Sequence, residues 1–509
     1  MKKKYLREIF PVILIFSVIL VVFYQALFNQ FKADDFAWLY VAEISKDNIF
    51  NSFTLDLGGF FRPFNHLLFL GWYSFFGLNP LGYHSVNILL FHFVNSILVY
   101  YLVKKLANKQ AALITSLIFA TSAVHFDSIL FQSGGMVDNG LSTFFTLFSF
   151  ISFIKWQETA KRKYLFASFL VFVFNLLSFE SSVILPTLLF AYLVIFSGRF
   201  NVESLLIHVK KLILYIIPLI PYLIFQYIIQ KSGLVVNLGI YYFGFHFLQN
   251  IWDYFVSMFI VFPTIDIIDI ARLGALKILY PIVQNTILIT YVIVLLASGF
   301  IFIKGSKHYK FFLLWFAIAI LPFSFFVPPE QSRFTYAASI GTSALLAMFL
   351  CYIHEKSFSY LGATKSNLIL MGLVSLVVIG NSVVMILIEN YKFNNGVSDE
   401  SVMINFMKSE HPTFPEGSKI YFVTDSMPFR DLILHMVMRL YYPSGVVEPH
   451  SITTYENGVN STYTIYYPVS YEIFEISRSE VQHIVADNST YIFDFMKTDY
   501  SPGKGVKLT

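Results

Sequence analysis

Residues 10–28 (FPVILIFSVILVVFYQALF) form a run of nineteen mostly apolar residues, and the stretch Phe31–Trp38 (FKADDFAW) follows it almost directly. A run of this length can cross a bilayer as one helix. The chain therefore places two adjacent carboxylates, Asp34 and Asp35, at a membrane face. Ionisable groups at such a place are costly and often functional, although two aspartates could also simply mark the end of a helix in water.

The composition is that of a membrane protein with several spans. Of the 509 residues, 56% are hydrophobic and only 13% are charged, which is too apolar for a water-soluble enzyme. Lys2, Lys3, Lys4 and Arg7 precede the first apolar run, and no small-residue cleavage site accompanies it. We therefore interpret this run as a retained membrane anchor rather than a removed signal peptide. The single cysteine, Cys351, excludes an intramolecular disulfide.

Further apolar runs follow along the chain and, with the first, predict about eleven transmembrane helices. These runs are Leu81–Val103, Ala111–His125, Asn139–Ile154, Tyr164–Leu177, Ser181–Phe196, Leu212–Ile229, Pro281–Ile303, Phe311–Val327, Phe334–Ile353 and Leu368–Ile388. Two more segments, Phe60–Gly77 and Phe247–Pro263, are apolar enough to cross. We expect both to lie along the outer interface instead, because a crossing by either would reverse the side of every later loop.

The basic residues set the expected orientation. If the N-terminus is cytoplasmic and the eleven runs cross in turn, every cytoplasmic connection contains lysine or arginine, as the positive-inside rule requires. The same alternation places the following acidic residues outside: Asp34, Asp35, Asp127, Asp138, Glu180 and Glu330. We therefore expect a multi-pass protein of the plasma membrane.

The composition changes after residue 389. Polar turns are followed by a predicted strand over Lys419–Thr424, an amphipathic helix over Phe429–Tyr441 and a strand over Thr490–Phe495. Alternating strands and helices of this kind predict a small α/β domain. We thus expect an α-helical polytopic membrane domain over residues 1–389. A small extracytoplasmic α/β domain should follow over residues 390–509.

Carboxylates from separate connections gather on the expected outer face, and arginines accompany them. Asp127 follows the third run, Asp138 precedes the fourth, and Glu180 lies between the fifth and sixth. Arg62 opens the first interfacial segment and Arg333 precedes the tenth run. An arginine can hold a phosphate through a fork of N–H groups. The alternatives are solvated loop charges, a carboxylate at a helix N-terminus, and arginines that only anchor helix ends.

The sequence shows no pattern for a bound metal or nucleotide. His66, His84 and His125 could be ligands, but no two share a helix face at i, i+4, so we expect no zinc site. A phosphate-binding glycine-rich loop of the P-loop type is absent, which argues against a nucleotide-driven pump. The sequence leaves open whether a divalent metal ion assists the reaction.

Paired carboxylates, phosphate-binding arginines and a membrane surface together suit one reaction. A sugar whose leaving group is a lipid-linked phosphate is attacked by an acceptor. A carboxylate removes the proton from the acceptor hydroxyl or amine, and an arginine stabilises the charge on the departing phosphate. The residues therefore predict a glycosyltransferase that needs no nucleotide on the outer face.

Four stretches resemble the GT-C superfamily of integral-membrane glycosyltransferases, most closely the transmembrane O-mannosyltransferases that carry tetratricopeptide repeats. The stretches are Asp34-Asp35, Phe61–Asn65 with Gly82–His92, Val124–Asp138, and Ser332–Gly341. They follow the family's order over about the first 350 residues. Asp127, Met136, Phe179 and Ser332 depart from the family's Glu, Arg, Lys and Glu, and the repeats are missing.

The resemblance implies roles for individual residues. Asp34 or Asp35 would be the catalytic base, with Asp34 favoured by its place in the family's acidic pair. Asp127 would orient the acceptor or the base, and Arg333 would hold the lipid phosphate. The residues expected to bind substrate are Arg62, His66, His125, Asp138, Glu180, Arg333 and Tyr336. The implied substrates are a polyprenyl-phosphate sugar and a protein, lipid or glycan acceptor, with inversion at the sugar.

Two alternatives remain open at this point. The first is a ligase that moves a whole glycan from a lipid diphosphate. The second is a lipid or solute transporter. Transporters usually show internal repeats and charges near the bilayer midplane, whereas here the charges lie at helix ends.

Overall fold

The structure, a computed structural model, describes most of the chain. The described residues are 2–54, 60–198, 201–230, 239–258, 289, 292, 296–300, 303, 305–327, 332–393, 397–423, 431–443, 447–456, 459–468, 470–484, 489–494 and 506–507. They form two compact units. The first contains Met1–Leu27, Gly59–Asn65 and His84–Tyr391, and the second contains Phe28–Gly58, His66–Tyr83 and Lys392–Thr509. The second unit thus combines the C-terminal part of the chain with the segment that carries the acidic pair.

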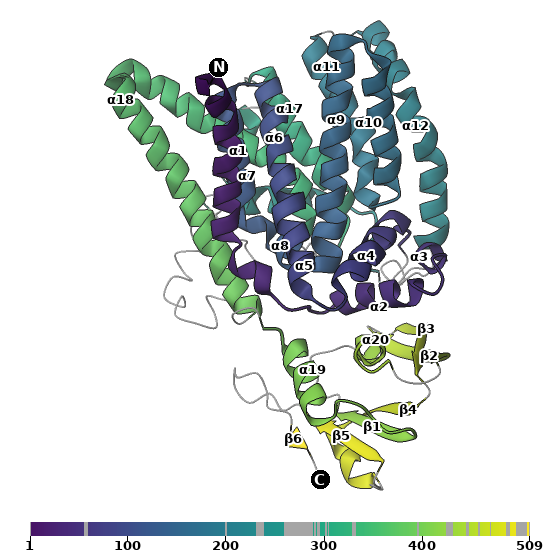
Figure 1. Ribbon diagram of the computed structural model, residues 1–509. Coiled ribbons are helices and arrows are strands. Elements are labelled where there is room, and N and C mark those ends of the chain that lie inside the picture. The colour runs from purple at the N-terminus through teal and green to yellow at the C-terminus, as the bar shows by residue number, and fades with distance from the viewer. Residues whose placement is uncertain are drawn as a thin grey trace. The chain divides into compact units, whose positions relative to one another are not determined.

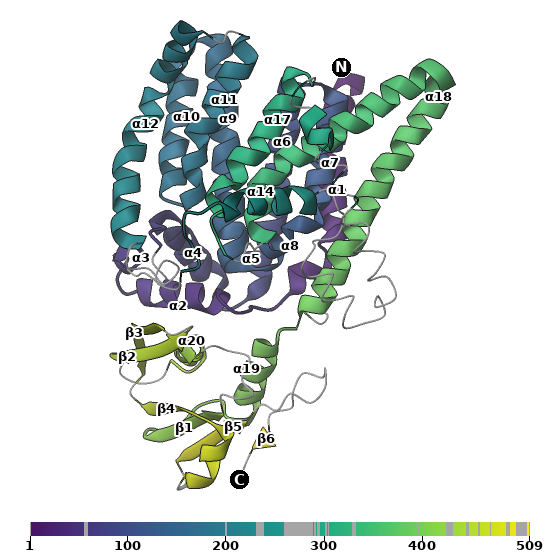
Figure 2. The same cartoon turned by 180° about the vertical axis from the view of Figure 1, so that it is seen from behind.

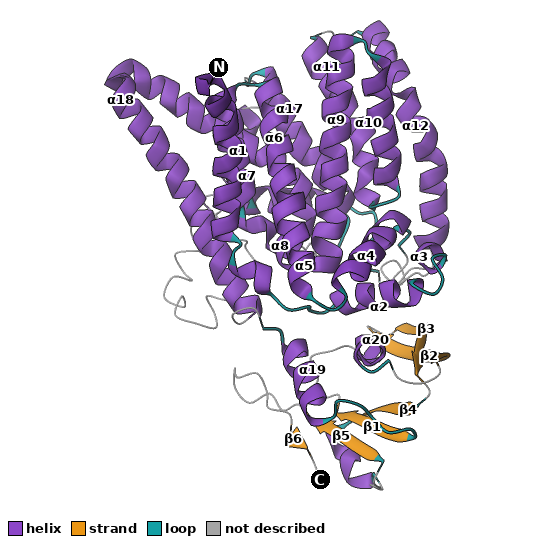
Figure 3. Ribbon diagram, in the orientation of Figure 1, coloured by secondary structure: helices purple, strands orange, loops and turns teal. Residues whose placement is uncertain are grey.

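The first unit is mainly helical (Figures 1 and 3). Its α-helices are α1 (Lys2–Val22), α6 (Phe93–Leu106), α7 (Lys109–Thr121), α8 (Phe126–Leu130), α9 (Leu141–Thr159), α10 (Arg162–Leu176), α11 (Ile184–Ser197), α12 (Val202–Gln230), α14 (His246–Ser257), α17 (Lys307–Ile320) and α18 (Thr335–Phe393). Between them lie the π-helical segments η2 (Val86–His92) and η4 (Gln132–Gly140) and the 3-10 turns η1 (Gln25–Phe28), η3 (Ala123–His125), η5 (Glu180–Val183), η7 (Leu321–Phe323) and η8 (Ser332–Phe334).

The helices of the first unit pack around an aromatic core. α9 packs against α10, α6 against α7, and α11 against α12 and α17 (Figure 1). From behind, α14 lies beside α17 (Figure 2). Trp315 of α17 is 1% exposed, and its ring meets that of Phe150 edge-on at 5.3 Å. Such a pair contributes about 0.5–1.5 kcal/mol beyond its buried area, so aromatic contacts stabilise the helix packing.

Five helices in the described part of the chain are long and apolar enough to cross a membrane. They are Pro80–Leu106, Gly135–Thr159, Glu180–Ser197, Val202–Ile229 and Ser332–Asn390. The bent pair Lys109–Thr121 and Ala123–Leu130 would be a sixth span. The chain is therefore a mostly helical multi-pass membrane protein, as predicted. The number eleven and the orientation stay predictions.

Three predicted spans have different limits in the structure. α12 begins at Val202 rather than at Leu212, because polar residues lower the local hydropathy without preventing a helix. α17 ends at Ile320, shortly before Pro322, which lacks the N–H that would continue the helix. α18 runs through the predicted loop as far as a break at Gly362, whose φ of 75° suits glycine.

The two segments expected at the interface begin as short helices. α4 (Pro63–Phe76) fills most of the first, and α14 opens the second. Neither is among the helices long enough to cross. The second segment beyond residue 258 lies outside the described residues, as do Glu330 and most of the predicted run Pro281–Ile303.

The second unit contains helices and all the strands of the described chain (Figure 3). Besides most of α4, its helical elements are α2 (Asp35–Ser45), α3 (Asn51–Thr54), α5 (Pro80–Ser85, which continues into the first unit), α19 (Asp399–Glu410), α20 (Asp431–Tyr441) and the 3-10 segment η10 (Arg478–His483). Its strands are β1 (Ser418–Val423), β2 (Val447–Glu456), β3 (Val459–Pro468), β4 (Tyr471–Ile476), β5 (Thr490–Asp494) and β6 (Val506–Lys507).

The C-terminal part of the chain forms a small, mainly parallel sheet. Its strand order is β4-β1-β5-β6, with β1 parallel to both neighbours and β6 antiparallel to β5, while β2 and β3 form a separate hairpin. Parallel neighbours need crossover connections, and α20 lies in the connection from β1 to β4. β1 and β5 lie where strands were predicted, and α20 lies within the predicted amphipathic helix. Ile420 and Phe422 of the central strand are fully buried.

Candidate functional site

The acidic pair lies at the start of α2, where its two carboxylates have different surroundings. Asp35 is 1% exposed, and its Oδ2 accepts a hydrogen bond from the backbone N–H of Lys32 at 3.0 Å. This bond closes the turn that begins α2. Asp34 is exposed, and its side chain makes no capping hydrogen bond to the helix. Adjacent helical side chains point in different directions; here one supports the turn and the other faces outward.

The backbone just before the pair adopts an unusual conformation. Ala33 has a φ of 48°, in the left-handed region, which costs an L-residue about 1–2 kcal/mol. Such a conformation persists when the surrounding structure holds it. The Ala33 N–H donates to the Glu400 carboxylate at 3.2 Å, and the Phe31 carbonyl accepts from the Ser398 hydroxyl at 2.7 Å. The C-terminal part of the second unit thus supplies side-chain partners for this backbone.

His66 lies against α2 in the same unit. Its ring meets Trp38 edge-on at 4.9 Å, and its Nδ1 lies 3.1 Å from the Ser52 carbonyl oxygen. A carbonyl only accepts hydrogen bonds, so Nδ1 carries the proton. Three of the predicted site residues, Asp34, Asp35 and His66, therefore belong to the second unit.

Arg62, Asp138 and Glu180 form a buried ion-pair cluster in the first unit. The Arg62 Nη1 donates to Asp138 Oδ2 at 2.6 Å, while its Nε and Nη2 bind both oxygens of Glu180 at 2.8–3.2 Å. Asn65 donates to the other oxygen of Asp138 at 2.8 Å. The side chains of Arg62, Asp138 and Glu180 are 13%, 2% and 23% exposed. The cluster joins the segment before α4 to η4 and η5.

Aromatic rings complete the surroundings of Arg62. Its guanidinium carbon lies 4.3 Å from the centre of the Phe60 ring and 4.7 Å from that of Phe179. Phe179 therefore stacks on the cation, at a position where the O-mannosyltransferase pattern has a lysine. Burial alone would lower the pKa of Arg62, but the carboxylates of Asp138 and Glu180 raise it above its ordinary value. One positive and two negative groups leave the cluster with a net negative charge.

Asp127 is tied to the turn that carries Arg333. The Ser332 hydroxyl donates to Asp127 Oδ2 at 2.9 Å. In addition, the Ser128 hydroxyl donates to the Arg333 carbonyl at 3.0 Å, and that of Thr335 donates to the Val124 carbonyl at 3.0 Å. The Arg333 side chain is partly exposed and lies within electrostatic range of Asp138. Two of the predicted motifs thus meet, and their bonds fix the backbone at Arg333.

His125 and Tyr336 lie in the interior of the first unit. Both are fully buried, with ring centres 4.7 Å apart. His125 Nε2 lies 2.7 Å from the Ser339 hydroxyl, and the Tyr336 hydroxyl lies 2.8 Å from Nδ1 of His92. Because His92 Nε2 lies 3.0 Å from the Ala120 carbonyl and must donate to it, Nδ1 accepts the Tyr336 proton. This network connects the start of α18 with η2 and η3.

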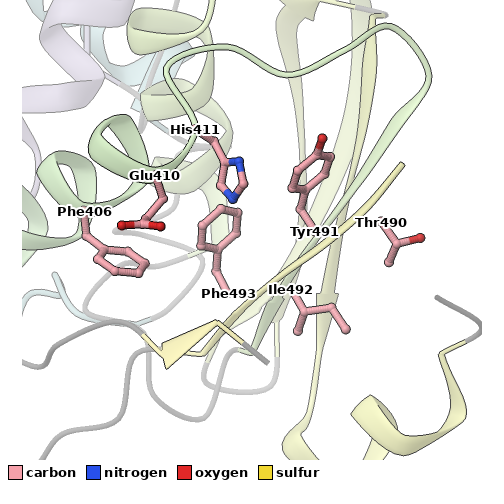
Figure 4. A pocket seen from close by; sticks show the side chains of 7 residues that line it. All are labelled: Phe406, Glu410, His411, Thr490, Tyr491, Ile492 and Phe493. Atoms are coloured by element: carbon pink, nitrogen blue, oxygen red, sulfur yellow. The ribbon is translucent and has the colours of Figure 1, made fainter. Parts of the chain in front are cut away.

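In the part of the chain that the structure describes, two cavities lie away from the predicted site residues. One of about 150 Å³ lies among α7, the end of α14 and α18. The other, of about 30 Å³ in the second unit, is lined by Phe406, Glu410, His411, Thr490, Tyr491, Ile492 and Phe493 (Figure 4). Its volume is that of roughly one or two water molecules, so it does not accommodate a sugar ring. Among the described residues, no group of three or more His, Cys, Asp or Glu side chains could hold a metal ion.

The structure thus brings the predicted residues together in separate groups. Arg62, Asp138 and Glu180 pair with one another; Asp127 adjoins Arg333; His125 adjoins Tyr336; and Asp34, Asp35 and His66 lie in the second unit. Their contact with a substrate stays a prediction.

Sequence reasoning missed four residues that hold these groups in place: Asn65, Ser332, Ser398 and Glu400. A signal existed for Ser398, because a serine before Asp399 and Glu400 is typical of a helix N-cap.

The chain resembles GT-C-type membrane glycosyltransferases. Residues 76–225 match the family described as dolichyl-phosphate-mannose-protein mannosyltransferase. The predicted resemblance to this class of enzyme is confirmed. No curated protein sequence matches the chain.

Solved structures show the same fold. ArnT from Cupriavidus metallidurans in the apo state is similar, with a TM-score of 0.51, 12% identity, and coverage of 85% of this chain and 84% of ArnT. ArnT from the same organism bound to undecaprenyl phosphate gives a TM-score of 0.50, 11% identity, and coverage of 85% of each chain. At this identity the likeness concerns the fold, which extends over most of both chains.

Proposed function

We propose that the protein transfers a sugar from a polyprenyl-phosphate donor to a protein, lipid or glycan acceptor on the extracytoplasmic face of the membrane. The family match and the fold support sugar transfer. The similar ArnT structure that binds undecaprenyl phosphate supports a donor of this chemistry. The alternation of basic and acidic loops supports a cytoplasmic N-terminus and an outer position of the acidic pair.

The proposed mechanism rests on the different exposure of the two aspartates. Asp35 is buried and bound to the Lys32 N–H, whereas Asp34 is exposed at the end of a fixed turn. A general base must reach the proton that it removes, and only the outward carboxylate is accessible. We therefore assign the base to Asp34 and a structural role to Asp35.

The reaction is a single displacement. Asp34 takes the proton from the acceptor hydroxyl or amine, and the acceptor atom bonds to the anomeric carbon from the face opposite the phosphate. The bond between that carbon and the phosphate oxygen breaks with its electron pair on the oxygen, so the configuration inverts. Arg333 stabilises the charge on the released polyprenyl phosphate.

The test compares the same substitution at the two neighbours. Asp34→Asn removes the base and should lower transfer by about 10²–10⁴-fold, with unfolding near that of the wild type. Asp35→Asn keeps an oxygen that can accept the Lys32 N–H, so most transfer should remain. The measurement is the transfer of labelled sugar from a purified polyprenyl-phosphate donor to acceptors in membranes. Wild-type transfer by the Asp34→Asn protein would remove this residue from the mechanism.

A further inference from the structure

The N-terminus of α19 contacts the segment that leads into the acidic pair. Ser398 and Glu400 are separated from Phe31 and Ala33 by 367 positions in the chain. All four residues belong to the second compact unit. Ser398 and Glu400 are nearly fully buried, with 1% and 4% of their residue surface exposed. A contact of this kind is built into the fold rather than formed by chance at the surface.

Ser398 connects the two backbones through one hydroxyl group. Its Oγ accepts the N–H of Ser401 at 3.1 Å, which caps α19, and it donates to the carbonyl of Phe31 at 2.7 Å. The hydroxyl supplies one donor and accepts as well, so both bonds form together. The start of α19 and the position of Phe31 are therefore coupled.

Glu400 binds the backbone of a residue in the left-handed region. Its Oε1 accepts the N–H of Ala33 at 3.2 Å, and Ala33 has the left-handed φ of 48°. A hydrogen bond to a charged acceptor is stronger than one between neutral groups, and burial strengthens it further. Asp34 follows Ala33 directly, so a change in the Ala33 backbone turns the Asp34 side chain.

Further contacts join the same two parts of the second unit. The Lys32 ammonium lies 5.2 Å from the centre of the buried Phe393 ring. α20 packs against α2, where Arg439 Nη2 lies 4.0 Å from Glu43 Oε1. Burial would raise the pKa of Glu43, but its hydrogen bonds to Lys46 and Tyr73 and the charges of Lys46 and Arg439 lower it. Glu43 is therefore ionised at neutral pH and pairs with Arg439.

We propose that Ser398 and Glu400 are positioning residues, through which the small C-terminal domain holds Asp34 in the geometry for proton removal. The role of Asp34 in this statement rests on the proposed function. The contact itself does not, because it is a property of the fold. The domain that takes the place of the tetratricopeptide repeats is thus a part of the catalytic apparatus that fixes its base.

The experiment combines hydrogen exchange with kinetics on the full-length protein. Glu400→Ala should speed amide exchange in a peptide covering residues 31–36 by about tenfold, the factor for one lost hydrogen bond of average strength. It should lower kcat by about 10²-fold, as a misplacement of about 1 Å can, while KM for the donor stays within about twofold of the wild type because the donor site is unchanged. Glu400→Gln keeps an oxygen acceptor, although a neutral one that binds less strongly, and should restore most of the protection from exchange and most of kcat.

Two variants on the same helix serve as matched controls. Glu410 is exposed at the end of α19, and the Ser409 hydroxyl bonds only to the carbonyl of Phe406 among the contacts described. Glu410→Ala and Ser409→Ala should leave exchange at residues 31–36 and kcat unchanged. Ser398→Ala should act like Glu400→Ala, with faster exchange at the start of α19 as well.

The possible failures are distinguishable. Unchanged exchange at residues 31–36 in Glu400→Ala overturns the positioning role, whatever the activity. Faster exchange with unchanged kcat also overturns it, because the contact would then be structural only. Equal losses of kcat in Glu400→Gln and Glu400→Ala would also overturn the positioning role. Failure of the proposed function shows instead as wild-type transfer by Asp34→Asn, and the exchange measurement still decides whether the contact orders the loop.

Discussion

Arg62 joins three segments that are far apart in the sequence. Its side chain binds the carboxylates of Asp138 and Glu180, and that of Asp138 is almost completely buried. Removal of one partner from a buried ion pair leaves an uncompensated charge and costs about 3–5 kcal/mol. An exposed pair contributes only about 0–1 kcal/mol. Burial, rather than the number of ion pairs, therefore decides which charges matter for stability.

This difference can be measured with two matched substitutions. Arg62→Gln should lower the free energy of unfolding by about 3–5 kcal/mol. Lys104→Gln breaks the exposed 3.0 Å pair with Glu8 and should leave the free energy of unfolding close to that of the wild type. Both are measured by reversible unfolding in mixed micelles at neutral pH. A similar loss in the free energy of unfolding for the two variants would contradict the view that the Arg62 cluster stabilises the loops of the first unit.

At the scale of elements, close approach of α17 and α18 depends on one glycine. A Cβ atom at Gly341 would lie 2.4 Å from the carbonyl oxygen of Phe312 and 2.9 Å from the backbone nitrogen of Phe316. Backbone atoms at these distances cannot give way as a flexible side chain can. The glycine therefore allows the helix that follows Arg333 to pack directly on α17.

Alanine substitutions at two glycines of α18 test this contact. Gly341→Ala should destabilise the protein by about 1–3 kcal/mol through overpacking. Gly372 has nothing within 4 Å of its ideal Cβ position, so Gly372→Ala should stabilise the helix by about 0.5–1 kcal/mol. The measurement is thermal unfolding followed by circular dichroism. If the two variants had the same melting temperature, the close packing of α17 against α18 at Gly341 would not contribute to stability.

At the scale of the whole molecule, the proposed mechanism requires one orientation in the membrane. The distribution of lysine and arginine between the connections on the two sides sets this orientation, rather than the net charge of the chain. Lys161 lies in the connection between α9 and α10, and Asn460 pairs in register with Tyr455 in the β2–β3 hairpin. The proposed topology puts these two positions on opposite sides.

Cysteine labelling tests the topology. In a Cys351→Ala background, a cysteine at position 161 should react with an impermeant maleimide only after the cells are permeabilised, and one at position 460 should react in intact cells. Permeabilised cells, in which both positions should react, serve as the control. Labelling of both positions in intact cells, or of neither, would contradict the proposed number of crossings between them.

Much of the fold could be predicted because its cause is local. A helix that crosses a membrane must be apolar along its own length, so the runs around residues 81–103 and 181–196 could be recognised without any neighbour. The strands at Lys419 and Thr490 were predictable from their composition and the turns around them. The limits of α12 and α18 could not be predicted in this way. Hydropathy indicates whether a segment lies in lipid or in water, but it does not show where the backbone hydrogen bonds of a helix end.

The class of protein, the acidic pair and the strands of the small C-terminal sheet were predictable from the sequence. The binding of Asp138 and Glu180 by Arg62, at separations of 76 and 118 positions, was visible only in the folded chain. The same is true of the burial of Asp35, the exposure of Asp34 and the bond of Glu400 to the backbone before them. The physical reason is that hydropathy and helix-forming tendency belong to a segment, whereas an ion pair or a buried carboxylate exists only when packing brings distant groups together.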